Sequence, residues 1–304
     1  MSLLADHPWL VKYTPDDGTL VDLLYVPALR CAIRYDRLTG FFSASASALA
    51  LAVRGVEGLL LNGGYMRLVV GCTLEQPEIE AIAKGETLRE TVERKVTAVP
   101  LDPVHSGMVD ALELLAWMVA QGHLDVKIAV PCDADRKPVI STAIFHEKSG
   151  IIEDRVGDRI AFNGSLNETA AGWTRNWESL NVFTSWEDAK RLGKEEENFA
   201  RIWADRAVHV LTIDVPTAVR DDLFRFLPTD TPPARIKRAD AAARPSPHPG
   251  SRPGAVGASA TASHRSSKAG LGVHPSCPRH TGRRRACRRG DLRRLPMAAS
   301  GARL

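Results

Sequence analysis

The sequence I-F-H-E-K-S-G-I-I-E-D occupies residues 144–154, followed by I-A-F-N-G-S-L-N-E-T at 160–169 and N-W-E-S-L-N-V-F-T-S-W at 176–186. Each of the three stretches joins a short apolar run to polar residues at one end, a pattern that predicts three short strands with polar groups at their ends. Residues two apart on a strand point to the same side. The side chains of His146 and Lys148 are therefore predicted to emerge next to each other from one strand.

The second stretch adds donors that suit an anion. Gly164 lets the backbone turn tightly and offers N–H groups, and Ser165 and Asn167 supply a hydroxyl and a carboxamide. Together with the ammonium group of Lys148, these donors would stabilise negative charge that develops on a phosphate. The pattern thus predicts a phosphate site at the ends of adjacent strands.

His146 is the candidate nucleophile of this site, and Glu178, near the start of the third stretch, would fix its tautomer and stabilise the imidazolium. An alternative is that His146 packs half-buried on a strand, that Lys148 is a solvated strand residue and that G-S-x-N is only a turn. H-x-K alone is a common tripeptide. Its combination with G-S-x-N on the next predicted strand favours the functional interpretation.

At these residues the chain resembles the phospholipase D-like superfamily, whose signature is H-x-K, an Asp five residues past the Lys, and then G-S-x-N. Glu153 stands where that Asp is expected, which is a conservative departure. Glu178 stands eleven residues past Asn167, where the single-motif nucleases of the superfamily place a glutamate that supports the histidine. The positions that match the signature are His146, Lys148, Gly164, Ser165 and Asn167.

The resemblance covers roughly the first 225 residues. The text G-S-L-N-E-T-x-x-G-W with N-x-E-S looks most like the N-terminal domain attached to bacterial DEAD/DEAH-type helicases, some linked to restriction and phage defence. It implies a metal-independent phosphodiesterase or nuclease that acts on DNA through a phosphohistidine and needs no cofactor. Because the superfamily builds its site from two such motifs, a chain with one motif is expected to form a homodimer. A helicase partner is also implied.

Alternating helical and strand patterns predict an α/β body with a mixed sheet flanked by helices. Besides the three motif strands, we expect strands at residues 31–38, 66–71, 124–130 and 208–215. Helices are expected at residues 20–24, where Pro27 should kink or end the helix, and at 43–61, 75–99, 109–119 and 187–205. Trp173 and Trp177 could stack on nucleic-acid bases, but the acidic body favours an anchoring role in the core.

Charge divides the chain into two parts. From residue 235 onward there are 16 Lys/Arg and 2 Asp/Glu, which leaves 24 basic and 34 acidic residues before it. The terminal part is rich in Ala, Arg, Pro, Gly and Ser and has too few large apolar residues to form a core. We therefore expect a domain at residues 1–230 and a disordered basic tail at 231–304. The tail is interpreted as the product of a frameshift or truncation before a helicase, with a nucleic-acid-binding arm as the alternative.

Other classes of protein are disfavoured by composition. No apolar run approaches the ~20 residues of a membrane span, and the isolated cysteines suit a reduced compartment, so a cytoplasmic protein without membrane contact is expected. Cys277, His280 and Cys287 match no zinc spacing, and no metal is predicted. Two alternatives to the nuclease remain: a non-catalytic DNA-binding or targeting module of a helicase or defence system, and a lipid phosphodiesterase, which lacks a membrane-facing segment.

Overall fold

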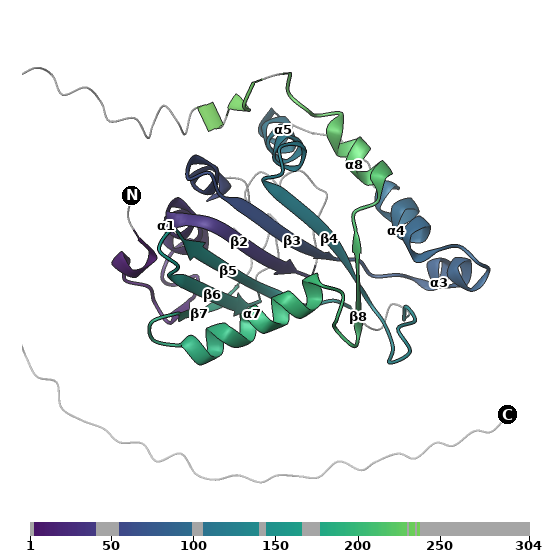
Figure 1. The fold of residues 1–304 in the computed structure, drawn as a ribbon, viewed down its shortest axis with the longest axis horizontal. Helices are drawn as coiled ribbons and strands as arrows, with labels where there is room; N and C mark the ends of the chain where they lie inside the picture. The colour runs from purple at the N-terminus through teal and green to yellow at the C-terminus, as the bar shows by residue number, and fades with distance from the viewer. Residues whose placement is uncertain are drawn as a thin grey trace, which may run out of the picture. The chain divides into compact units, whose positions relative to one another are not determined.

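A mixed sheet of eight strands forms the centre of the fold (Figure 1). The computed structural model describes residues 3–40, 55–98, 106–139, 144–165, 177–229, 231–234 and 236–237. The strands are β1 (Lys12–Tyr13), β2 (Ala32–Thr39), β3 (Tyr65–Gly71), β4 (Leu124–Pro131), β5 (Lys148–Asp154), β6 (Arg159–Gly164), β7 (Leu180–Thr184) and β8 (Val210–Asp214). The predicted mixed sheet flanked by helices is confirmed.

The strand order is β1-β7-β6-β5-β2-β3-β4-β8. The pairs β2–β3 and β3–β4 are parallel, whereas all other neighbours are antiparallel. Strands β5 and β2 lie at the centre of the sheet. The three strands that carry the motif, β5, β6 and β7, follow one another in the sheet order. This order brings the ends of the three motif strands to one region, as the sequence predicts.

Helices cover both faces of the sheet. The described helices are α1 (Val26–Cys31), α3 (Gln76–Ala83), α4 (Leu88–Thr97), α5 (Ser106–Ala120), α7 (Ala189–Trp203) and α8 (Thr217–Phe224), with a 3-10 turn at Leu4–Asp6, a π-helical turn at Val21–Tyr25 and helical residues at 55–61. Figure 1 shows α7 lying across the sheet, with α4, α5 and α8 beyond β4.

Alternation along β5 explains how the two faces are buried. Ile151 packs into the apolar cluster under α7, which also contains Leu192 and Phe199 of that helix. Ile152 points to the opposite face and joins the larger cluster that α1 and α5 cover. Because Lys148 has the same parity as Ile152, its side chain belongs to the face opposite α7.

Two predicted helices differ from the helices in the structure. The predicted helix at 75–99 is two helices, because Gly85 has a φ of +105° and Thr87 begins α4 with a capping box in which its hydroxyl accepts from the Glu90 N–H at 3.2 Å. Pro27 does not end the helix before it; a π-helical turn continues into α1 with Pro27 in the first turn, where its missing N–H is tolerated. Neither β1 nor α8 was predicted.

The predicted start of a helix at Ser43 and most of the predicted tail lie outside the described residues. Ile236, beyond the domain boundary expected near residue 230, is only 7% exposed and belongs to the larger apolar cluster. A truncation that removes the tail should therefore keep Ile236.

Gly150 lies under the motif and provides a test of the packing there. A Cβ atom at Gly150 would stand 2.2 Å from the Phe162 ring, and such overpacking of a core typically lowers the free energy of unfolding by about 1–3 kcal/mol. We expect Gly150→Ala to unfold at lower urea concentration than the wild type. Gly193, inside α7 with open space around it, is the control: Gly193→Ala should be neutral or stabilising. Equal midpoints for both variants would contradict this packing.

A candidate phosphate site at the ends of β5, β6 and β7

Lys148 is a buried cation at the first position of β5. It lies opposite Thr39, the last residue of β2, and is 3% exposed. Its ammonium group donates a hydrogen bond to the backbone carbonyl of His146 at 3.1 Å. Burial lowers the pKa of Lys148 below that of an ordinary lysine, whereas the nearby charge of Glu178 opposes this shift and that of Arg37 adds to it. A partly desolvated ammonium of this kind interacts strongly with an anion that displaces the remaining water.

His146 precedes β5 and is exposed. The prediction that His146 and Lys148 emerge side by side from one strand is therefore wrong, since the strand begins at Lys148. The cause is the close approach of Gly40, where a Cβ atom would meet the carbonyl oxygen of Phe145 at 2.6 Å and the Cα of His146 at 3.0 Å. The backbone before Lys148 thus passes over the end of β2, and the residue before the strand reaches the surface.

The two groups therefore differ in their access to solvent. The exposed His146 can reach a substrate from solvent, while the buried Lys148 holds the backbone of that same histidine through its carbonyl. An exposed imidazole whose backbone is held by a buried ammonium is suited to attack on a phosphate group.

Ser165 and Gly164 tie the end of β6 to the start of β7. The Ser165 N–H donates to the carbonyl of Ser179 at 3.2 Å, and the Ser179 N–H donates to the Ser165 hydroxyl oxygen at 3.2 Å. A Cβ atom at Gly164 would stand 2.0 Å from the same Ser179 carbonyl. The close approach of the two backbones therefore requires glycine at position 164. Because the Ser165 hydroxyl accepts a hydrogen bond from Ser179, its own proton is still available to donate to a ligand. Asn167 lies outside the described residues.

Glu178 comes two residues before β7 and is buried. Its charge acts on Lys148, so the structure brings these two predicted site residues together. The short connection from Glu178 through Ser179 to the Ser165 hydroxyl links the third motif strand to the second. Lys148, Ser165 and Glu178 thus come from three neighbouring strand ends in the order that the sequence predicts.

Arg37 is a charged residue near this site that the sequence interpretation missed. It lies on β2 opposite Gly150, is completely buried, and holds its guanidinium carbon 5.4 Å from the centroid of the Phe162 ring. Its charge lowers the pKa of Lys148 further. The only sequence signal is the pair of arginines within the strand A-I-R-Y-D-R-L-T, which does not tell which of them is buried.

Two acidic residues, Glu153 and Asp154, follow the H-x-K motif, and they have different contacts. Glu153, which stands at the place of the expected Asp, forms an ion pair with Arg34 at 2.6 Å on the α7 side of the sheet. The adjacent Asp154 is buried and accepts from the backbone N–H groups of Leu4, Val156 and Asp158 at 2.9–3.1 Å. Asp154 therefore organises the β5–β6 turn, away from the candidate site.

Trp177 is 68% exposed, so the prediction that it anchors a loop on the core is wrong. Its neighbour Glu178 is buried, and the chain therefore turns its carboxylate inward and the indole toward solvent at the same place. Trp173 lies outside the described residues. The indole of Trp177 is therefore accessible to another molecule beside the buried carboxylate of Glu178.

The described residues place no three His, Cys, Asp or Glu side chains together as a metal would need. In the same part of the chain, no helix is both long and apolar enough to cross a membrane.

Comparisons with known proteins agree with the motif. A family model described as "Cardiolipin synthase, PLD-like domain" matches residues 113–203. No curated protein matches the chain. Solved structures that match this chain include NucT from Helicobacter pylori, at 12% identity and a TM-score of 0.38, over 66% of this chain and 97% of that one.

Two further structures show similarity at the same level. Nuc from Salmonella typhimurium, a phospholipase D family member, is 14% identical with a TM-score of 0.37, over 68% of this chain and 97% of that one. Phosphatidylserine synthase from Haemophilus influenzae Rd KW20 is 14% identical with a TM-score of 0.35, over 74% of this chain and 45% of that one. The predicted phospholipase D-like resemblance is thus confirmed for residues 113–203, the part that contains all the proposed site residues.

Proposed function

We propose that this chain is a phosphodiesterase that cleaves DNA without a metal, with His146 as the nucleophile. The observation that carries the proposal is the buried ammonium of Lys148, which donates a hydrogen bond to the backbone of the exposed His146 and on which the charge of Glu178 acts. A buried ammonium is costly unless it is paired or serves a site. An incoming phosphate would meet the imidazole first and then the positive charge that stabilises its transition state.

The proposed reaction has two steps. An imidazole nitrogen of His146 attacks phosphorus, so that a P–N bond forms while the P–O bond to the leaving group breaks, and the leaving oxygen takes a proton from a second imidazole. That second imidazole then accepts a proton from water, whose oxygen attacks phosphorus and breaks the P–N bond. Lys148, Ser165 and Asn167 stabilise the negative charge in both steps, and Glu178 orients the imidazole.

The second imidazole belongs to the His146 of another copy of this chain. The motif occurs once in the sequence, and a twofold axis beside it would place two copies of His146 across from each other. We therefore expect residues 1–237 to have twice the monomer mass in light scattering at tens of micromolar. A monomer under those conditions that still hydrolyses a diester would contradict the two-histidine scheme.

Trp177 supports nucleic acid as the substrate. Stacking of a base on an exposed indole contributes about 1–3 kcal/mol per base. We expect Trp177→Ala to raise KM about tenfold for a single-stranded oligonucleotide and to leave KM unchanged for an abasic strand of equal length. Trp186, exposed at the opposite end of β7, is the matched control, and Trp186→Ala should affect neither substrate. Equal effects of Trp177→Ala on both strands would remove the stacking role.

The alternative is a non-catalytic DNA-binding module that serves a helicase or a defence system. The acidic character of the body before residue 235 favours this alternative over a nuclease of broad affinity, because sequence-independent binding needs many contacts to phosphates. The two functions are separated by incubating the protein with labelled DNA and with bis(nitrophenyl) phosphate in EDTA. Turnover of both supports the phosphodiesterase, and DNA binding without turnover of either supports the module.

A further inference from the structure

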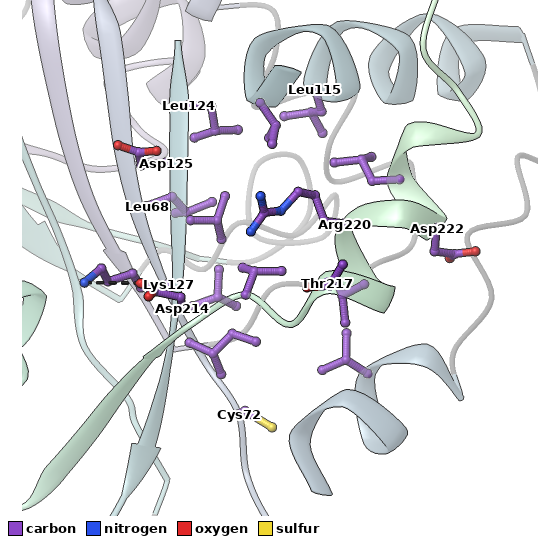
Figure 2. Close-up of a pocket in the computed structure, with 18 of the residues that line it drawn as sticks. Leu68, Cys72, Leu115, Leu124, Asp125, Lys127, Asp214, Thr217, Arg220 and Asp222 are labelled. Carbon is purple, nitrogen blue, oxygen red and sulfur yellow. Dashed lines mark ion pairs between the residues drawn. The ribbon is translucent and has the colours of Figure 1, made fainter. Parts of the chain in front are cut away.

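A hollow of about 640 Å³ lies between the sheet and the helices beyond β4 (Figure 2). Strands β3, β4 and β8 form its floor, and helices α4, α5 and α8 form its walls. Its volume falls within the range of pockets that bind small molecules. One lining residue, Gly71, approaches the backbone of Gly40 and Phe145 at the end of β2.

The layer over this hollow is packed less closely than a protein interior usually is. None of the eight residues of α8, all of them described, is buried. The floor is apolar nonetheless, with Leu68, Leu124 and Val126 directed toward the helices. Leu68 and Leu124 belong to the larger apolar cluster, against which Leu223 of α8 packs at the edge of the hollow. Interiors normally fill such space at crystal-like density. The hollow is therefore suited to an apolar body of another molecule.

A positively charged side chain of α8, Arg220, lines the hollow. Figure 2 shows the guanidinium group of Arg220 extending from that helix into the middle of the hollow, toward Leu68 and the strands. Three carboxylates line the hollow: Asp222 pairs with Arg225, Asp214 pairs with Lys127, and the charge of Asp125 acts on Arg67. Within the part of the chain that the structure describes, no acidic side chain pairs with Arg220.

We propose that this hollow binds an amphipathic monoanion, an apolar chain or ring system that ends in a carboxylate or phosphate held by Arg220. The apolar floor would contact the body of the ligand, and the planar guanidinium would bind its anionic end through two hydrogen bonds. Arg89, which also lines the hollow, adds a second positive charge. Arg220 is exposed, so a neutral ligand of the same shape would gain the apolar contacts but lose the two charge-assisted hydrogen bonds to the guanidinium.

The test uses the fluorescent probe anilinonaphthalene sulfonate, which joins an aromatic body to an anion. We expect saturable binding to the full chain, displacement by decanoate, and displacement by decanol at least tenfold weaker. Arg220→Gln should raise the Kd for the probe and for decanoate about tenfold. Arg206→Gln is the matched control, because it removes the same charge from an exposed site outside the hollow and should change neither Kd more than twofold.

A second variant tests whether the ligand occupies the hollow. Val219→Phe on α8 should place a ring in the hollow and abolish saturable binding while the melting temperature is kept or raised. The proposal is overturned if decanol competes as well as decanoate, if Arg220→Gln and Arg206→Gln behave alike, or if Val219→Phe binds normally. Absence of saturable probe binding to the wild type would also overturn it. None of these readouts depends on hydrolysis, so the result is independent of the proposed function.

Discussion

Replacing His146 with alanine is expected to lower the rate of diester hydrolysis by at least about four orders of magnitude, the scale of losing a residue on which the catalytic group depends. His146 supplies both the attacking nitrogen and, from the second copy, the acid that protonates the leaving oxygen. One substitution therefore removes two catalytic groups from the proposed dimeric site. Because the side chain is exposed, the free energy of unfolding should not change measurably.

The measurement is the single-turnover rate on labelled DNA together with a urea unfolding curve. His209→Ala is the matched control, since His209 is also exposed and also lies within two residues of the start of a strand, in this case β8. That variant should keep the wild-type rate, and His146→Gln should fold and bind DNA normally. Substantial hydrolysis by His146→Ala, or a loss of stability as large as the loss of rate, would exclude His146 as the nucleophile.

Replacing Lys148 with methionine is expected to lower kcat by about 10²- to 10³-fold, which corresponds to roughly 2–4 kcal/mol for one lost donor to a developing anion. Methionine keeps much of the volume of the side chain and removes its charge. Glu178→Gln should be milder than loss of His146, because it weakens the orientation of the imidazole without removing the attacking atom. Lys190→Met, at an exposed position in α7, is the control and should leave kcat unchanged.

The same variant changes the pH dependence of stability. Burial lowers the folded-state pKa of Lys148 below its ordinary value of 10.5, so between these two values the unfolded chain binds more protons than the folded chain does. The free energy of unfolding of the wild type therefore rises with pH across that window. Lys148→Met should lack this rise in urea unfolding measured at successive alkaline pH values. Parallel curves for the two proteins would show that Lys148 titrates normally.

Much of the sheet could be predicted because its strands are short apolar runs bounded by turn residues. The predicted strand at 66–71 is β3 within one residue, and the predicted strand at 124–130 is β4 within one residue. The short β1 escaped prediction because two residues carry no period. The division of the helix at 75–99 was missed although the sequence T-L-R-E at its middle is a capping-box pattern.

The sequence predicted which residues belong to the candidate site better than it predicted how they are arranged. A period of two predicts which residues share a face, but it does not predict where the partner strand ends, and it is Gly40 at the end of β2 that lifts His146 off the strand. The burial of Arg37 depends on its register with Gly150 and on the Phe162 ring that fills the space above that glycine. Such contacts join residues more than a hundred positions apart, so no local pattern reports them.

The most direct test of the account is a search for the covalent intermediate. Wild-type protein mixed with phosphorus-labelled DNA in EDTA and quenched in base within milliseconds to seconds should carry an acid-labile phosphoramidate, which peptide mapping places on His146. The Glu178→Gln variant, with its slower turnover, should carry the same adduct, and His146→Ala should carry none. Hydrolysis that proceeds with no adduct on His146, or that stops in EDTA and returns with a divalent metal, would contradict a metal-independent phosphohistidine mechanism.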